Sequence, residues 1–132
     1  MKNNYLFVYG TLMQASGHAM HQVLKAHSQF VCQAWMLGKL YQIHDYPGVI
    51  QSTNSNERVY GELYHLTEPE RVLTRLDDYE ACSAAFPTPH EYDRQLIDVH
   101  TSDTKTLKAW TYLYNHPVIE RNRILTGYFN QR

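Results

Sequence analysis

The chain has 132 residues, and its 12 Lys and Arg residues nearly balance its 13 Asp and Glu residues. We expect a single domain over residues 1–132, because this length can bury an apolar core without disulfide bonds. The charges are interspersed along the chain, which argues against a nucleic acid or an anionic membrane surface as a partner. No apolar run is long enough to cross a bilayer and the start lacks an apolar leader, so the sequence favours a cytoplasmic protein.

Cysteine and tyrosine usage adds two constraints. The two cysteines, Cys32 and Cys82, form no CxxC pair and are too few for a disulfide framework, which fits a reduced compartment. The 11 tyrosines cluster in strand-like segments. They indicate a β-rich core with polar tips near a pocket.

The first strong pattern is the apolar and aromatic run over residues 5–9, which predicts a fully buried strand. Gly10 ends this run and lets the backbone turn. Because Thr11 and Leu12 follow at once, successive backbone N–H groups leave a rigid strand with little side chain in the way. Such a turn suits capture of a carboxylate or an oxyanion, and an ordinary strand-to-loop turn explains the same residues.

The next segments alternate between strand-like and polar stretches. Gly38 interrupts one of them, as a bulge or a barrel bend does. In order, the sequence predicts a short helix over 18–26, a β-rich stretch over 30–43, a turn over 45–48, a short strand over 49–51, a polar hairpin loop over 52–56 and a strand over 58–66.

A helix is predicted from Thr67 to about Tyr79. Thr67 is the expected N-cap, Glu70 completes a capping box, and Pro69 falls within the first turn. An apolar stripe along the segment indicates that the helix packs on a sheet by one side. Residues 81–90 contain two prolines and predict a loop.

Two long strands are predicted over residues 92–101 and 107–115, joined as an antiparallel hairpin by the polar turn at 102–105. The tail over 122–132 is expected to be a short capping element at most. The fold class that follows is α+β: a small mixed or antiparallel β-barrel with two or more flanking helices. Both tryptophans are expected in the core.

Glu80 is the first candidate for chemistry. It follows the last turn of the predicted helix, beside the acidic pair Asp77 and Asp78. The negative end of the helix dipole and the neighbouring acids both disfavour its charged form, which predicts a raised pKa. A glutamate tuned in this way can accept and return a proton near neutral pH, whereas a solvated glutamate at a helix end is the plainer interpretation.

Several segments, taken in order, resemble the gamma-glutamylcyclotransferase-like family, of the AIG2-like or gamma-glutamylamine cyclotransferase type. The matching segments are Tyr9-Gly10-Thr11-Leu12, Tyr46-Pro47, Gly61-Glu62-Leu63-Tyr64, Leu76-Asp77-Asp78-Tyr79-Glu80, Tyr92-Asp93-Arg94 and Ala109-Trp110-Thr111-Tyr112. They cover nearly the whole chain. The resemblance implies a small mixed barrel whose cavity opens by the turn after the first strand.

The resemblance also implies a reaction. In the family, the free α-amine of a γ-glutamyl amide attacks the side-chain carbonyl, which releases the amine and forms 5-oxoproline. The catalytic glutamate of the family falls on Glu80, and its substrate-holding loop falls on Tyr9, Gly10, Thr11 and Leu12. Tyr112 matches a pocket tyrosine of some members. No metal or cofactor is implied, and the partner is a small-molecule γ-glutamyl substrate.

Tyr92 and Arg94 receive a supporting role. In an alternating strand their side chains point the same way, so one can reach the cavity while Arg94 pairs with Asp77 or Asp78 and holds the helix end. The sequence departs from the family after Glu80, where residues 81–90 replace a glycine and a short link. This departure leaves the identity of the γ-glutamyl compound open.

Three alternatives are weighed against this interpretation. Cys82 with one of the eight histidines would give a thiol hydrolase, and a small loop residue explains Cys82 as well. His18 and His21 could share a metal on a helix, but no further ligand has a useful spacing. A non-catalytic barrel that binds a γ-glutamyl or amino-acid-like ligand is the main rival. Oligomeric state stays open.

Overall fold

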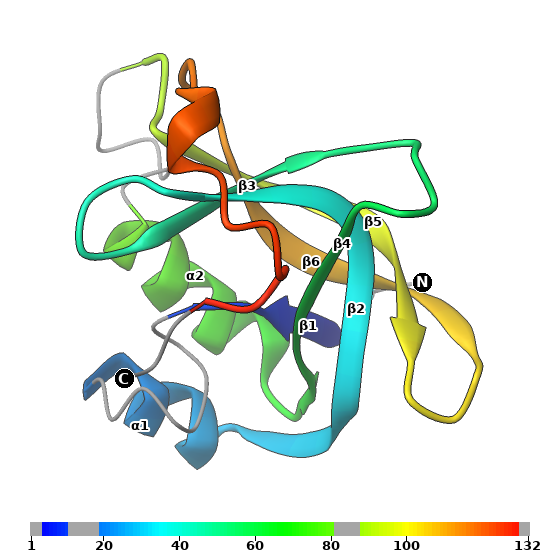
Figure 1. Ribbon diagram of the computed structural model, residues 1–132. Helices are drawn as coiled ribbons and strands as arrows, with labels where there is room; N and C mark the ends of the chain where they lie inside the picture. The colour runs from blue at the N-terminus through cyan, green and yellow to red at the C-terminus, as the bar shows by residue number, and fades with distance from the viewer. Residues whose placement is uncertain (1–3, 11–18, 81–87, 130–132) are drawn as a thin grey trace.

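The computed structural model describes residues 4–10, 19–80 and 88–129. Within these ranges the strands are β1 (Tyr5–Val8), β2 (Ser28–Gln42), β3 (Pro47–Gln51), β4 (Arg58–Leu66), β5 (Tyr92–Thr101) and β6 (Thr106–Tyr114). The helices are α1 (Ala19–Ala26), α2 (Pro69–Tyr79) and the short 3-10 helix η2 (Glu120–Asn122). In Figure 1, α1 and α2 lie on one side of the strands. None of the described helices has the length and apolar character needed to cross a membrane.

The strands close into a barrel. The sheet order is β3-β2-β4-β1-β6-β5, and an additional pairing of β2 with β5 joins the two ends so that five strands are closed and β3 lies outside. β1 runs antiparallel to β4 and parallel to β6, which makes the barrel mixed. The predicted α+β class, a small mixed barrel with flanking helices, is therefore confirmed.

β1 is buried on both faces, as predicted, because it lies between two apolar clusters. Leu6, Phe7 and Val8 are 0%, 1% and 3% exposed. Phe7 belongs to the cluster that fills the barrel, whereas Leu6 and Val8 belong to the cluster under the helices. Each such burial contributes on the order of 1.5–3 kcal/mol, so β1 is held by both halves of the core.

β2 is long enough to serve two neighbours. On one edge it pairs with β4 from Ser28 to Leu37, and on the other with β5 at Ala34 and Trp35 and then with β3 from Gly38 onward. A side chain at Gly38 would lie 2.9 Å from the carbonyl oxygen of Ile50, so the close approach of β3 requires glycine there. The register of the β2–β4 pairing shifts between Phe30 and Cys32, so the irregularity of that pairing lies there and not at Gly38.

Two local predictions around β3 were wrong. The loop over 52–56 does not form a hairpin, because β3 and β4 both pair with β2 instead of with each other. The turn predicted at 45–48 ends earlier, since Pro47 and Gly48 already belong to β3. Pro47 is the first residue of that strand, a position where a missing N–H is tolerated.

The capping box predicted for α2 is also absent. Glu68 occupies the N-cap position without a side-chain cap, and Pro69 begins the helix. Thr67 instead donates its hydroxyl to the carbonyl oxygen of His27 at 2.8 Å, which ties the end of β4 to the turn after α1. The apolar stripe is as predicted, with Val72, Leu73 and Leu76 buried.

The tryptophans are only partly buried, and of the two only Trp110 packs against a core cluster of the described residues, the one under the helices. Trp35 stacks on His100 with ring centroids 4.1 Å apart, and the Arg58 guanidinium lies 3.9 Å from the Trp35 ring. The Arg94 guanidinium lies 4.4 Å from the ring of Trp110. Each indole is covered on one ring face by an arginine, a cation–π arrangement.

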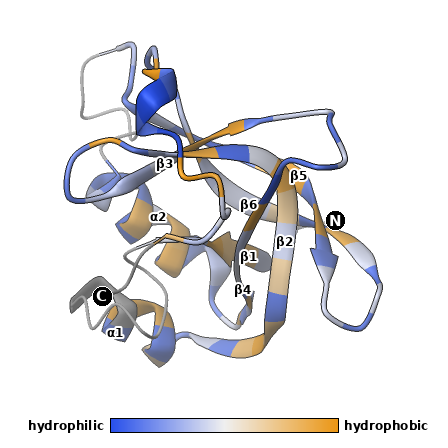
Figure 2. Cartoon of the chain, in the orientation of Figure 1, coloured by the Kyte–Doolittle hydropathy of each residue, from blue (hydrophilic) through white to orange (hydrophobic). Residues whose placement is uncertain are grey.

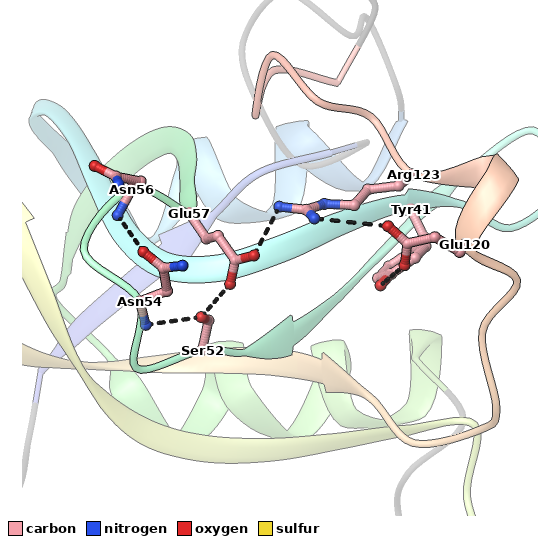
Figure 3. A network of polar contacts seen from close by, with 7 residues as sticks. All are labelled: Tyr41, Ser52, Asn54, Asn56, Glu57, Glu120 and Arg123. Carbon is pink, nitrogen blue, oxygen red and sulfur yellow. Dashed lines mark hydrogen bonds and ion pairs between the residues drawn. The ribbon is translucent and has the colours of Figure 1, made fainter.

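Within the described residues, the segment after η2 packs across the barrel, as expected of a capping element. Arg123 forms a β-bridge with Tyr41, and the N–H of Ile124 donates to the carbonyl oxygen of Leu40 at 2.7 Å. Gly127 adopts φ +78, a conformation that favours glycine. Figure 2 shows that η2 is hydrophilic, and Figure 3 shows how Glu120 and Arg123 connect this segment to Tyr41 and Glu57.

Candidate active site

A cavity of about 260 Å³ lies beside the carboxyl end of β1. It is formed by β1, the connection between β2 and β3, the end of α2, β5 and β6. Its lining residues are Phe7, Val8, Tyr9, Gly10, Tyr46, Pro47, Tyr79, Glu80, Glu91, Tyr92 and Tyr112. Five residues singled out from the sequence thus meet here: Tyr9, Gly10, Glu80, Tyr92 and Tyr112. Thr11 and Leu12 lie outside the described residues.

Glu80 enters this cavity from the end of α2. Its backbone N–H donates to the carbonyl oxygen of Leu76 at 2.8 Å, so the last turn of the helix fixes where the side chain starts. Burial, reinforced by the negative charges of Glu91 and Asp77, raises the pKa of Glu80 to about 7. The direction agrees with the sequence prediction, but the largest cause is loss of solvent.

Glu91 and Tyr46 are site residues that the sequence analysis missed. The Tyr46 hydroxyl donates to Oε2 of Glu91 at 2.7 Å, and both residues line the cavity. Burial and this hydrogen bond raise the pKa of Tyr46. Tyr46 was part of a motif that could have flagged it, whereas Glu91 directly follows residues 81–90, which depart from the family pattern, and carried no signal of its own.

Three tyrosines of the cavity donate hydrogen bonds from their hydroxyl groups to oxygen atoms of the protein. Tyr9 donates to the carbonyl oxygen of Tyr112 at 2.6 Å, and Tyr112 donates to Oδ1 of Asp77 at 2.7 Å. Tyr92 donates to the carbonyl oxygen of Pro47 at 2.5 Å. Burial raises the pKa values of Tyr9 and Tyr92, which keeps both hydroxyls protonated. These bonds join β1, β3, β5, β6 and α2 around the cavity.

Arg94 lies behind the cavity and does not line it. Its guanidinium donates from Nε to Oδ1 of Asp77 at 2.8 Å and from Nη2 to Oδ2 at 3.1 Å. Asp77 is one of the two partners expected from the sequence. Because Asp77 also accepts from Tyr112, this bidentate pair fixes the last turn of α2 against β5 and β6. Glu80 follows that turn directly.

Gly10 is required for space at the rim. A Cβ atom there would lie 2.6 Å from Cγ of Pro47, so only glycine lets the end of β1 approach the start of β3. The carbonyl oxygen of Pro47 in turn accepts a hydrogen bond from the Tyr92 hydroxyl. The sequence assigned Gly10 to a turn, and the structure adds that close packing demands the same residue.

Comparison with known proteins identifies the family. The model of the family described as gamma-glutamyl cyclotransferase, AIG2-like, matches residues 6–131. The chain belongs to this family. A search of curated proteins gave no match.

Solved structures of similar fold agree with the family assignment. YkqA from Bacillus subtilis is 26% identical with a TM-score of 0.71, and the match covers 97% of this chain but only 40% of that one. An AIG2-like protein from Mus musculus is 23% identical with a TM-score of 0.67, covering 89% and 80%. A structure named gamma-glutamyl cyclotransferase is 17% identical with a TM-score of 0.60, covering 84% and 66%.

The charged side chains among the described lining residues of the cavity are acidic. Among the described lining residues none is Lys, Arg or His, and the two ionisable carboxyl groups are Glu80 and Glu91. Across the described part of the chain, no group of three or more His, Cys, Asp or Glu side chains could hold a metal ion. His18 and Cys82, which entered the alternative hypotheses, lie outside the described residues.

Proposed function

We propose that the protein is a γ-glutamyl cyclotransferase. Its substrate is a γ-glutamyl amide, and its products are 5-oxoproline and a free amine or amino acid. The observation that carries the proposal is Glu80, a carboxyl group that lines the cavity with a pKa of about 7. Membership of the family supports the same reaction.

Glu80 is the proton carrier in this proposal. Its carboxylate accepts a proton from the α-ammonium of the substrate, and the freed nitrogen lone pair attacks the γ-carbonyl carbon. As the C–N bond to the leaving group breaks, Glu80 returns the proton to the departing nitrogen. The ring nitrogen, which still carries two protons after the attack, releases one of them to solvent, so the products are the lactam N–H of 5-oxoproline and a free amine. A pKa close to neutral suits both steps, because the group must give up the proton as readily as it takes it.

The rest of the site selects the reactive conformer. Nucleophile and carbonyl belong to one molecule, so the protein gains most by holding the γ-glutamyl chain folded back on itself. We assign the substrate-holding role to Tyr9, Gly10, Thr11 and Leu12, whose backbone N–H groups would bind the α-carboxylate or the developing oxyanion, and to Tyr112. Tyr92 and Arg94 support the site, Arg94 by fixing Asp77 beneath Glu80.

The test is to incubate the purified protein with a panel of γ-glutamyl amino acids and γ-glutamyl amines and to detect 5-oxoproline. Wild type should form it from at least one panel member, and the Glu80→Gln variant, folded by circular dichroism, should not. The panel then identifies the leaving group. If wild type binds a panel member and forms no 5-oxoproline, the protein is a non-catalytic binding domain of the same fold.

A further inference from the structure

The second acid of the cavity, Glu91, has no part in the reaction described so far. It lines the same cavity as Glu80 but comes from a different part of the fold, just before β5 rather than at the end of α2. Its charge faces Glu80, since it is one of the causes that raise the pKa of that group. The described lining of the cavity thus holds two carboxyl groups and no Lys, Arg or His.

Glu91 is held in one position. Its side chain accepts the Tyr46 hydroxyl at 2.7 Å, and its carbonyl oxygen accepts the backbone N–H of Asn115 at 2.7 Å. The Asn115 side chain donates to the carbonyl oxygen of the preceding residue, His90, at 3.0 Å. Both the backbone and the carboxylate are therefore fixed, which is the arrangement expected of a residue that must present its charge at a set place.

Four of the five tyrosines that line the cavity leave acceptors for a ligand. The hydroxyl protons of Tyr9, Tyr46, Tyr92 and Tyr112 are all donated to protein oxygens. These four tyrosines therefore present hydroxyl oxygen and ring faces to a ligand. An ammonium group, which has three N–H donors and no acceptor, is the chemical partner that suits such a wall.

We propose that Glu91 binds the α-ammonium of the substrate while Glu80 exchanges the proton. The inference rests on the proposed cyclotransferase reaction. One N–H of the ammonium faces Glu80 and leaves as the proton that Glu80 accepts. A second N–H faces Glu91 and stays on the nitrogen, so the lone pair formed by the transfer is turned toward the γ-carbonyl carbon. Glu91 exchanges no proton, and the proton on Glu80 goes to the leaving nitrogen. The third ammonium proton leaves the ring nitrogen for solvent after the attack, so that the product keeps a single lactam N–H.

Other titratable groups also face the two acids. Asp77 from α2 faces Glu80, but it is paired with Arg94. Tyrosines surround the acids from β1, the β2–β3 connection, β5 and β6: they are Tyr9, Tyr46, Tyr92 and Tyr114. Asp45 acts on Tyr46, and His90, next to Glu91 in the chain, lies 3.9 Å from Asp93. Of these acids, Asp77 and Glu91 act on Glu80 most directly.

Kinetics of the Glu91→Gln variant provide the first test. Loss of a charged hydrogen bond to the ammonium should raise KM by about tenfold or more. Removal of a negative neighbour should also lower the pKa of Glu80, so the acid limb of kcat/KM should move about one unit to lower pH. Glu91→Asp, which keeps the charge, should retain the position of the limb. Unchanged KM and an unchanged limb in Glu91→Gln would overturn the proposal.

The matched control is Glu120→Gln. Glu120 also accepts a hydrogen bond from a tyrosine, Tyr41, at 3.2 Å, but it lies outside the cavity lining. This variant should keep the KM and the pH profile of wild type. Equal changes in both variants would mean that loss of a tyrosine–glutamate bond alters the barrel in general, which would also overturn a specific role for Glu91.

A binding experiment separates this inference from the reaction on which it rests. In the Glu80→Gln background, calorimetry compares L-γ-glutamyl ethylamide with its N-acetyl derivative, which lacks the ammonium. The amine should bind at least about tenfold more tightly, and adding Glu91→Gln should abolish the difference. If wild type makes no 5-oxoproline, the cyclotransferase proposal fails, and this comparison still decides the role of Glu91. No binding of the amine, or a difference that survives Glu91→Gln, would overturn it.

Discussion

Two tyrosine–glutamate hydrogen bonds lie in opposite electrostatic surroundings. In the cavity, Tyr46 donates to Glu91 at 2.7 Å, and the described lining residues include no cation. Near the end of the chain, Tyr41 donates to Glu120 at 3.2 Å, and Arg123 lies 3.7 Å from Glu120 and 3.3 Å from Glu57 (Figure 3). We call this second group the Arg123 cluster: Tyr41, Ser52, Glu57, Glu120 and Arg123.

The two surroundings move glutamate pKa values in opposite directions. Burial and neighbouring acids raise the pKa of Glu80 to about 7. A hydrogen bond from Ser52, together with the charges of Lys39 and Arg123, lowers the pKa of Glu57. Glu57 and Glu120 pair with Arg123 and fasten the chain, whereas Glu80 and Glu91, which have no cation among the described lining residues, are the acids that we propose for substrate binding.

The largest expected difference between the two regions is in activity. Glu80→Gln should lower kcat for 5-oxoproline formation by about 10²–10⁴-fold, the usual contribution of a positioned acid or base. Glu57→Gln should leave kcat within about twofold, because Glu57 lies outside the cavity lining. Initial rates at saturating substrate measure both. Similar losses in the two variants would remove the distinction between the regions.

The next effect is on stability. Arg123→Met removes the cation from Glu57 and Glu120, and it should lower Tm by roughly 5 °C or more at pH 7. The folded-state pKa of Glu57 is depressed, so its contribution is present at neutral pH and disappears as pH falls through the folded value. The difference in Tm between wild type and Arg123→Met should therefore narrow toward acid pH. The kcat/KM of the variant should equal that of wild type.

Glu80→Gln should have the opposite stability profile. The folded pKa of Glu80 lies above that of the unfolded chain, so protonated Glu80 is tolerated at low pH and its ionisation costs stability as pH rises to about 7. The variant should match wild type near pH 4 and exceed it by ~1–3 kcal/mol at pH 8. Urea unfolding at the two pH values measures this gain. A variant less stable than wild type at pH 8 would contradict the buried acid.

The smallest difference concerns the two tyrosine hydroxyls. Tyr46→Phe and Tyr41→Phe each remove one hydrogen bond to a glutamate and should cost about 1 kcal/mol of stability. Only Tyr46→Phe should lower kcat/KM, by about two- to fivefold, because only Glu91 faces the cavity. Urea unfolding and steady-state kinetics of the pair provide the measurements.

Periodicity and turn chemistry were sufficient to predict most of the barrel. β1, β4, β5 and β6 and the apolar face of α2 follow from local alternation or spacing. The pairing of β3 does not, because the length of β2 allows it to hold a partner on each edge, and no local pattern distinguishes this from a hairpin. The prediction of the start of α2 failed for a related reason: the Thr67 hydroxyl donates a hydrogen bond to the carbonyl oxygen of His27, a residue distant in the chain.

The site was predicted unevenly. Glu80 could be found because a helix end, neighbouring acids and a family motif coincide. Glu91 could not be found, because its importance depends on its hydrogen bond with Tyr46, which is 45 residues away in the sequence, and on its place in the same cavity as Glu80. The reason for Gly10 was likewise only partly visible, since the contact with Pro47 exists only once β3 is in place.

The most direct test of the central claim is the pH dependence of kcat/KM for 5-oxoproline formation, measured for wild type between pH 5 and 9. We expect an acid limb with a midpoint near the Glu80 pKa of about 7, and no such limb in the residual activity of Glu80→Gln. A wild-type profile that is flat through this range, or a limb that persists in Glu80→Gln, would show that Glu80 is not the group that exchanges the proton.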